Sequence, residues 1–157
     1  MDIQLRPADQ DDMLLIWRWA NDLDVRKNAF STDFISWESH VPWFLQKLAS
    51  QQCTIYVGIL DDIPIGQVRF DLMANHLCCD YMIDISIDLE CRERGIGTEL
   101  LRKAICVFTK SKHVRHLVAK VKKGNILSMK IFEKNHFVIN EIKTTNDVFF
   151  YELIVND

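Results

Sequence analysis

The sequence predicts a mixed α/β fold, in which a central, mostly antiparallel sheet of about seven strands is flanked by about four helices. The first observation is the order of segments with strand-like and helical periodicity: strand, two helices, three strands, helix, strand, helix, two strands. The second is the apolar run at residues 83–89, which is followed closely by the helical pattern of residues 97–110. Because that helix connects two strands, the strands on either side of it are expected to be parallel.

The N-terminal third is expected to be mainly helical. After a short strand at residues 3–6, acidic residues crowd the first turn of a helix at residues 9–21, as the helix dipole favours. A further short helical turn is expected at residues 24–30. Ser36 is a favourable N-cap for a helix that extends to Leu48. The apolar side chains expected on the inner faces of the two longer helices are Met13, Leu14, Trp17 and Ala20, and Trp37, Val41, Phe44, Leu45 and Leu48.

The rest of the chain is expected to alternate between strands and helices. Residues 53–60 and 65–71 have strand character and are joined by the Asp61-Asp62 turn, so they form a hairpin. A long strand is expected at residues 77–89. The remaining elements are a helix at residues 97–110, a strand at 116–121, a helix at 125–135 and a final hairpin of residues 137–142 and 148–154. The helix at 97–110 is expected to turn inward Leu100, Leu101, Ala104, Ile105 and Phe108.

Length and composition favour one cytoplasmic domain. A chain of 157 residues that is 48% hydrophobic can bury a sizeable core, and we expect residues 1–157 to form a single domain. No apolar run reaches the roughly 18 residues of a membrane span, and the acidic N-terminus lacks the features of a signal peptide. The net charge of −3 argues against a nucleic-acid-binding protein. The oligomeric state stays open between a monomer and a homodimer.

The cysteines have the character of reduced thiols. Their number is odd and their contexts are strand-like, which is not the pattern of a disulfide framework. Cys78 and Cys79 lie close to His76 in the sequence, which could suggest a metal site. However, there is no C-x-x-C pair and no second ligand cluster at zinc spacing. We therefore expect no metal.

The junction between the strand at residues 77–89 and the following helix has the character of a pyrophosphate-binding turn. Its sequence is Arg92-Glu-Arg-Gly95-Ile-Gly97, and two glycines there allow a ligand to approach the backbone closely. The free N–H groups at the start of the helix favour an anion. A P-loop would need Lys followed by Ser or Thr after the second glycine, and a dinucleotide-binding turn would need a small residue where Leu100 stands.

The pattern that remains, Arg-x-x-Gly-x-Gly between a strand and a helix, resembles the coenzyme A loop of the GNAT acyltransferases. Residues 124–137 are similar to the later motif of the same family. There Asn125 opens a helix, Ser128 follows three residues on, and the aromatic Phe132 follows four beyond that. The order of the elements is also that of the GNAT fold, in which two neighbouring parallel strands splay apart and the pantetheine arm lies between them.

The resemblance implies an N-acetyltransferase whose donor is acetyl-CoA. The loop at residues 92–97 would hold the pyrophosphate through backbone N–H groups, and Thr98 would add a hydroxyl. In the family the preceding strand carries a bulge that exposes its backbone to the pantetheine amides, and we place this bulge at residues 85–87. The implied coenzyme-binding residues are Ile85, Ile87, Arg92, Glu93, Arg94, Gly95, Ile96, Gly97, Thr98, Asn125, Ser128 and Phe132. The locally basic segment at residues 110–123 is either a solvated surface or a docking surface for coenzyme A phosphates.

One position departs from the family's usual chemistry. A Tyr on the later helix often protonates the leaving thiolate, and Phe132 occupies the matching place in this chain. Phe132 is therefore expected to be both a core aromatic and a wall of the coenzyme site. Either Ser128, Asn125 or a water supplies the proton, or the thiolate leaves without a dedicated acid.

The general base is sought on the polar face of the long strand. Side chains two residues apart point the same way, so Asp84, Ser86 and Asp88 share a face. A buried carboxylate with a raised pKa could take the proton of the acceptor ammonium, and Asp84 is the first candidate. Ser86 would orient the water or the amine. His40 is the other candidate base, and its alternative is a packed histidine beside Trp37.

The acceptor is interpreted from the N-terminal half, which shapes that site in the family. The Trp-Arg-x-x-Asn, Val-Arg, Ser-x-Glu-x-His-x-x-Trp and Gly-Gln-Val-Arg-Phe-Asp segments resemble the branch that acetylates UDP-linked 4-amino sugars in pseudaminic acid biosynthesis and related bacterial nonulosonic acid and surface-glycan pathways. Arginines suit a diphosphate and aromatics suit a base or sugar. The expected acceptor-binding residues are Trp17, Arg18, Arg26, Trp37, His40 and Arg69. The alternative is that these aromatics are core residues and the arginines are surface ion-pair partners.

Two other functions stay open on the sequence. The same enzyme class could acetylate another amine: a protein N-terminus, a polyamine or an antibiotic. A deep Trp/Arg pocket favours the sugar nucleotide, and an open groove favours a peptide. The absence of the usual Tyr also permits a non-catalytic coenzyme A-binding module, which thioester turnover would distinguish from an enzyme.

Overall fold

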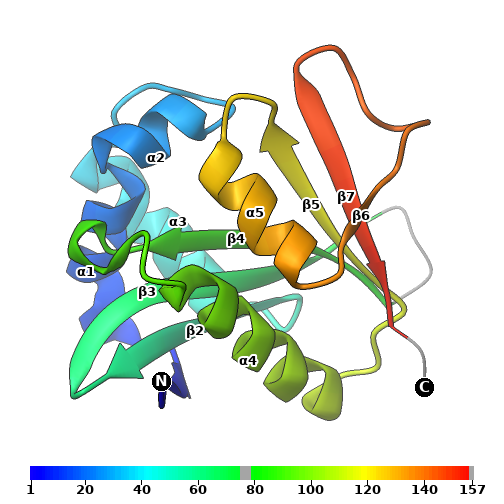
Figure 1. The fold of residues 1–157 in the computed structure, drawn as a ribbon. Helices are drawn as coiled ribbons and strands as arrows, with labels where there is room; N and C mark the ends of the chain where they lie inside the picture. Colours follow the sequence, from blue (N-terminus) through cyan, green and yellow to red (C-terminus); the bar gives the residue numbers. More distant parts are fainter. Residues whose placement is uncertain (75–78, 156–157) are drawn as a thin grey trace.

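The computed structural model describes residues 1–74 and 79–155, and its strands form one mixed sheet (Figure 1). The strands are β1 (Gln4–Pro7), β2 (Cys53–Leu60), β3 (Ile63–Leu72), β4 (Asp80–Ile87), β5 (His116–Lys122), β6 (Val138–Ile139) and β7 (Val148–Ile154). Their order in the sheet is β1-β2-β3-β4-β5-β7-β6. The β4–β5 pair is parallel and the other neighbouring strands are antiparallel. The predicted mixed fold, with one parallel pair, is therefore confirmed.

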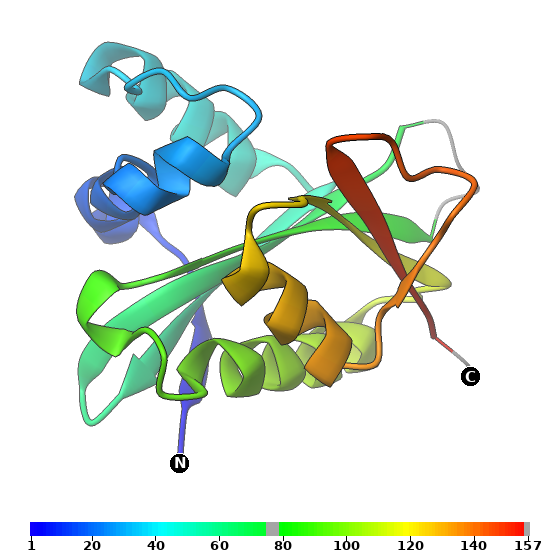
Figure 2. The ribbon, with the colours of Figure 1, turned by 45° about the horizontal axis from the view of Figure 1, so that its top comes forward.

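Helices cover both faces of the sheet. They are α1 (Met13–Ala20), α2 (Leu23–Asn28), α3 (Trp37–Ala49), α4 (Ile96–Ser111) and α5 (Ile126–Lys134), with single 3-10 turns η1 (Gln10–Asp12) and η2 (Leu89–Cys91). Figure 2 shows α4 and α5 together on one side of the sheet, and α1, α2 and α3 gathered on the other side. The order of elements follows the sequence prediction, and Ser36 caps α3 as expected, because its Oγ accepts from the Ser39 N–H.

The core is divided by the sheet into two clusters. The larger cluster joins β3, β4 and β5 to α4, with Leu100, Leu101, Ala104 and Phe108 fully buried. Ile105, which was expected to face inward with them, is only partly buried. The smaller cluster is formed by Ile16, Trp19, Phe44, Ile55 and Val57, which join α1 and α3 to β2. Because side chains alternate along a strand, β2 contributes Ile55 and Val57 to one cluster and Tyr56 to the other.

The inner face of α1 differs from the predicted one. Leu14 is 45% exposed, whereas Ile16 and Trp19 are buried. The four residues predicted to face inward all lie within α1, which begins after the 3-10 turn η1. The helix turns Ile16 and Trp19 toward Phe44 and β2, which leaves Leu14 on the outer side. Trp17 is partly buried, and its ring meets Phe34 and Trp37 edge-on at the surface of this helical layer.

Two predicted strands are shorter in the structure. The expected strand at 77–89 begins at Asp80 among the described residues and ends at Ile87, because Asp88 then accepts the Glu90 N–H and starts a 3-10 turn. The expected strand at 137–142 pairs only at Val138 and Ile139. After them the side chain of Asn140 accepts the N–H groups of residues 142 and 143, which turns the chain away from the sheet.

Candidate active site

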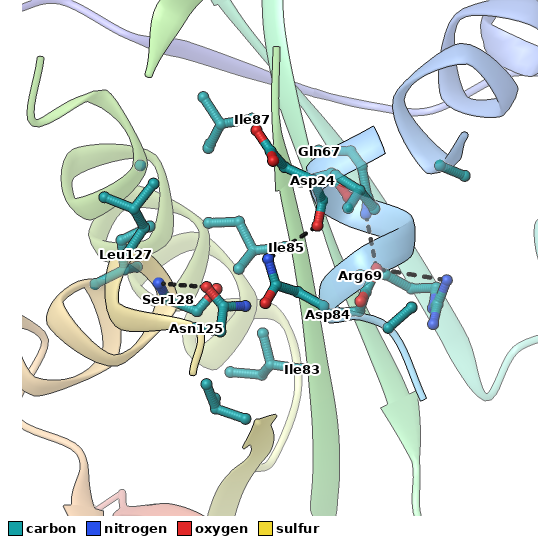
Figure 3. A pocket seen from close by; sticks show the side chains of 18 of the residues that line it. Asp24, Gln67, Arg69, Ile83, Asp84, Ile85, Ile87, Asn125, Leu127 and Ser128 are labelled. Atoms are coloured by element: carbon teal, nitrogen blue, oxygen red, sulfur yellow. Dashed lines mark hydrogen bonds and ion pairs between the residues drawn. The ribbon is translucent and has the colours of Figure 1, made fainter. Parts of the chain in front are cut away.

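The divergence of β4 from β5 opens a cleft in the middle of the sheet. The two strands pair only where Asp80–Met82 lies beside His116–Val118, and β4 continues to Ile87 without pairing to β5. The cleft has a volume of about 960 Å³ and is lined by residues of α1, α2, α3, β3, β4, α4, β5 and α5. Figure 3 shows Asn125 and Ser128 of the α5 start on one side of β4 and Gln67, Asp84 and Arg69 on the other.

The backbone edge of β4 faces this cleft. Asp88 N–H donates to the Ile65 carbonyl, and the β3–β4 register is continuous from Gly66–Ile87 to Leu72–Tyr81. In antiparallel pairs every second residue bonds to the partner strand, so the backbone groups of Ile85 and Ile87 point away from β3. The bulge expected at residues 85–87 is thus absent, and that prediction is wrong. The backbone is exposed instead because β5 departs, which leaves no β5 partner for Ile85 among the described residues.

The loop before α4 has a backbone suited to an anion. Gly95 is the N-cap of α4 and has φ +76°, and a Cβ built there would meet no atom within 4 Å. Because Gly95 has no side chain, the space beside the free N–H groups at the start of this 16-residue helix stays open. These features fit the pyrophosphate of acetyl-CoA. Glu93, Gly95, Gly97 and Thr98 line the cleft, whereas Ile96 is buried in the core and Arg94 is not among the lining residues.

The second glycine of the loop has a different role from the first. A Cβ at Gly97 would lie 2.7 Å from Cδ1 of Ile131 on α5 and 3.3 Å from Cγ1 of Ile87. Gly97 therefore allows α5 to approach α4 closely, which fixes the two helices that form one wall of the cleft. A larger residue there would disturb this packing before it met any ligand.

Arg92 is engaged by the protein. Its Nη2 lies 2.8 Å from Asp22 Oδ1, its Nη1 3.2 Å from Asp24 Oδ2, and its Nε donates to the Ile87 carbonyl at 3.1 Å. Asp22 also caps α2 by accepting the N–H groups of Asp24 and Val25. Burial raises the pKa of Asp22, but the bonds from Arg92 and from the Val25 N–H outweigh burial and hold that pKa below its ordinary value. Arg92 thus ties the coenzyme loop to α2.

The start of α5 forms the opposite wall. Asn125 is the N-cap, and its Oδ1 accepts the Ser128 N–H at 3.2 Å. Both side chains line the cleft, and so does Phe132. Phe132 is 3% exposed, meets Phe137 edge-on and stacks on Tyr151, so it is a core aromatic that also forms a wall of the cleft.

Asp84 lies on the cleft wall with two polar partners. Its Oδ2 accepts from Gln67 Nε2 at 2.9 Å and lies 3.7 Å from Arg69 Nη1 (Figure 3). The side chain is 49% exposed, so the expectation of a buried carboxylate is wrong. The reason is local: β4 carries Asp84 into the open cleft, while its neighbour Ser86 on the same face is buried. The structure brings Asp84 and Ser86 together as predicted, with Gln67 as an additional partner.

His40 is a packed residue of α3. It is 1% exposed, its ring lies among those of Trp37, Trp43 and Phe44, and Nε2 is 3.0 Å from the carbonyl of Met13. Because that partner can only accept, Nε2 carries the proton and Nδ1 is the acceptor in the neutral ring. Burial lowers the pKa of His40, which the bond to Met13 only partly offsets. The ring touches the cleft wall, so a role in the site stays a prediction.

The expected acceptor-binding residues do not form one group. Arg26 and Arg69 line the cleft, whereas Trp17, Arg18 and Trp37 do not. Arg26 donates to the backbone carbonyls of Ala20 and Ser31. With His40, three of the six expected residues therefore line the cleft, and the other three lie outside it.

Arg69 belongs to a charge network on β3. Its Nε donates to Asp71 Oδ2 at 2.6 Å, and its guanidinium lies 5.2 Å from the ring centre of Trp43. Asp71 also accepts from Lys47 at 2.6 Å. Burial lowers the pKa of Arg69, but the charges of Asp84 and Asp71 outweigh it and raise that pKa. Arg69 is therefore a permanently charged partner of Asp84.

Some cleft residues were missed by the sequence argument. Gln67 is 4% exposed and holds Asp84, and it stands two residues before Arg69 on the same strand face. That alternation could have identified it. Asn28 of α2 and Lys120 of β5 also line the cleft, and their sequence contexts give no comparable signal.

The described residues contain neither a cluster of metal ligands nor a helix that could span a membrane. Within residues 1–74 and 79–155 there is no cluster of three or more His, Cys, Asp or Glu side chains that could hold a metal ion. The possible site at His76 and Cys78 lies outside the described residues. The helices of this part of the chain are too short or too polar to cross a membrane.

Comparisons with known proteins agree with this geometry. Residues 2–138 match the model of the acetyltransferase (GNAT) domain family. The chain is 27% identical to the acetyltransferase PseH of Campylobacter jejuni over 125 residues, which cover 80% of this chain and 76% of PseH. The predicted resemblance to this family and to a pseudaminic acid branch enzyme is therefore confirmed at the level of the family.

Solved structures share the fold. A domain from Methanocaldococcus jannaschii superposes with a TM-score of 0.82 at 18% identity, covering 98% of this chain and 99% of the other. Spermidine N-acetyltransferase from Vibrio cholerae, solved with CoA and spermine, superposes with a TM-score of 0.83 at 17% identity, covering 97% and 95%. With the family match, the splayed strands and the anion-binding loop, these findings show that the chain belongs to the GNAT family of acetyltransferases, enzymes that use acetyl-CoA as acetyl donor.

Proposed function

We propose that the enzyme acetylates the 4-amino group of a nucleotide-linked amino sugar in bacterial surface-glycan biosynthesis. The observation that carries the proposal is the similarity to PseH, which spans most of both chains. It is supported by the cleft, which has a volume of about 960 Å³ and carries a carboxylate, that of Asp84, on its wall (Figure 3).

The residues of the cleft supply the groups that acyl transfer needs. Asp84 accepts the proton of the acceptor ammonium, directly or through water, and Gln67 and Arg69 hold its carboxylate in place. The outward-facing N–H of Ile85 on the unpaired edge of β4 polarises the thioester carbonyl. The loop at Gly95 and the start of α4 hold the pyrophosphate of acetyl-CoA. In this scheme Asp84 deprotonates the amine so that the amine can attack the thioester carbon.

The leaving thiolate needs a proton from another group. The hydroxyls that line the cleft are those of Ser39, Ser86, Thr98 and Ser128, and no tyrosine is among its described lining residues. Ser128 lies on the α5 wall with Phe132, one turn before it. Ser128, or a water that it holds, is therefore the proposed proton donor.

A thiol-release assay tests the acceptor. Purified enzyme and acetyl-CoA are combined with UDP-4-amino sugars, with N-terminal peptides and with polyamines, and the product mass is measured. The matched control is the same UDP sugar with a hydroxyl in place of the 4-amino group. Turnover confined to the amino sugar is the expected result. Turnover confined to peptides or polyamines would overturn the proposed acceptor and leave the acetyltransferase assignment intact.

A polyamine is the second candidate acceptor. The carboxylates of Asp24, Asp84 and Glu93 line the cleft and can attract a cationic chain, against the opposing charge of the arginines and lysines that line it as well. This candidate predicts turnover of spermidine that falls as ionic strength rises, because exposed charges are screened by salt. The same assay with spermidine at low and high salt distinguishes it from the sugar nucleotide.

A further inference from the structure

The arginines expected to bind a diphosphate are already used by the protein. Arg69 is paired with Asp71 and faces Asp84, while Arg26 donates to the Ala20 and Ser31 carbonyls. Arg92 is held by two aspartates of the α2 region. Part of their hydrogen-bonding capacity is thus already used by the protein. Lysines are the other cations near the cleft: Lys120 lines the cleft itself, and Lys27, Lys122 and Lys123 lie in an adjoining hollow.

A second hollow adjoins the cleft beyond the end of α2. It has a volume of about 630 Å³ and is formed by the end of α2, the β5–α5 turn and the turn before β7. Asn28 and Phe30 line both the cleft and this hollow, so the two spaces meet there. We call it the lysine hollow, because Lys27, Lys122 and Lys123 line it.

The lysine hollow has more positive than negative side chains. Against three lysines its described lining offers one carboxylate, Asp147, and none of the three lysines forms an ion pair with a carboxylate in residues 1–74 or 79–155. The Nζ of Lys122 donates to the Lys27 carbonyl at 3.3 Å. The Nζ of Lys123 lies 4.8 Å from the ring centre of Phe149. These contacts position two ammonium groups without neutralising them.

An aromatic surface stands at the junction of the two spaces. Phe30 is 61% exposed and lines both the cleft and the lysine hollow. A planar base can stack on such a ring. An anionic group beside a planar apolar group is the chemistry of a nucleotide, and ammonium groups bind phosphates as point charges.

We propose that the lysine hollow binds the diphosphate of the acceptor nucleotide and that Phe30 packs against its base, while the amino sugar extends into the cleft toward Asp84. This inference rests on the proposed function, which it sharpens by placing the acceptor's anionic end. The phosphates of coenzyme A have the same chemistry, so the experiment must distinguish the two sources.

The probe is UDP, which reports on the lysine hollow without any turnover. Its affinity is measured by calorimetry for the wild type, for Lys122→Gln, Lys123→Gln and the double variant, and for Lys112→Gln as the matched control. Lys112 is exposed just beyond α4 and lines neither space. Loss of one charge-assisted contact corresponds to about a tenfold loss of affinity, so each single variant should bind UDP about tenfold more weakly and the double variant about a hundredfold more weakly. The affinity for acetyl-CoA should stay unchanged in every variant.

The results distinguish a failure of the lysine hollow from a failure of the proposed acceptor. Weaker UDP binding with unchanged acetyl-CoA binding supports the lysine hollow even if no UDP-4-amino sugar is turned over, in which case the proposed acceptor alone fails. Turnover of the UDP-4-amino sugar that is indifferent to both lysines overturns the lysine hollow and leaves the proposed acceptor intact. Weaker acetyl-CoA binding in the double variant, or a wild type that does not bind UDP, also overturns it.

Discussion

The two sides of the cleft recognise their ligands with different parts of the chain. On the coenzyme side, the features that meet the ligand are backbone: the unpaired edge of β4, the left-handed Gly95 and the start of α4. On the acceptor side they are side chains, and some of the charged ones are already held by other groups of the protein, as Arg69 is by Asp71. A backbone site needs only the right local geometry, whereas a side-chain site also depends on which charges remain unpaired.

The largest expected effect is at the point where the two sides meet. Asp84→Asn removes the proposed base and should lower kcat by about 10²–10⁴-fold, because general base catalysis contributes that much. The affinity for acetyl-CoA should not change, since that side depends on backbone groups. The control is Asp88→Asn: Asp88 follows the same strand but accepts from Trp19 Nε1 and does not line the cleft. If Asp84→Asn keeps the wild-type rate and pH profile, Asp84 is structural and His40 is the next residue to test.

Removal of Arg92, which connects the coenzyme loop to α2, should have a smaller effect. Arg92→Ala removes the bonds to Asp22 and Asp24 and frees α2 from the coenzyme loop. A hydrogen bond between charged groups contributes about 1.5–3 kcal/mol, so the acceptor KM should rise by about tenfold or more, with a smaller change in acetyl-CoA affinity.

A double-mutant cycle with Asp22→Asn checks that the effect belongs to this pair. The two single changes and the double change should be clearly non-additive in the acceptor KM. The control is Arg102→Ala, which removes an exposed pair with Glu99 on the outer surface of α4. If Arg92→Ala instead weakens acetyl-CoA binding and leaves the acceptor KM alone, Arg92 is a phosphate ligand as the sequence had suggested.

The contrast between the two sides also explains what could be predicted from the sequence. The coenzyme loop is contiguous, so strand, turn glycines and helix start could all be recognised from residues 83–98. The acceptor side depends on partners far apart in the chain, such as Arg92 with Asp22, which no local pattern reveals. The same holds for Lys27 and Lys122, whose proximity depends on how α2 lies against the end of β5. The exposure of Asp84 was missed because it follows from the separation of β4 and β5.

The smallest expected effect concerns His40 and the pH dependence of the free energy of unfolding. Burial lowers the pKa of His40 in the folded protein, so the unfolded chain binds more protons between the folded pKa and the ordinary value of about 6.5. The free energy of unfolding should therefore decrease as pH falls from about 6.5 toward the folded pKa. Chemical denaturation across this pH range should show a shallower decrease for His40→Gln than for the wild type. His113→Gln, at an exposed position, is the control and should retain the wild-type slope.

The central claim is that the coenzyme side is a backbone site, and Gly95 tests it most directly. Gly95→Val places a β-branched side chain at φ +76° and fills the open space beside the start of α4. Gly124→Val is the matched control, because Gly124 also has open space around its Cβ position but has no left-handed φ.

The measurement is the calorimetric affinity for acetyl-CoA of the two folded variants, with folding checked by circular dichroism. A left-handed conformation costs a residue with a Cβ roughly 1–2 kcal/mol, and the side chain also occupies the anion's space, so Gly95→Val should lose about tenfold or more in affinity. Gly124→Val should bind acetyl-CoA like the wild type. Wild-type affinity in a folded Gly95→Val protein would contradict the assignment of this loop as the pyrophosphate site.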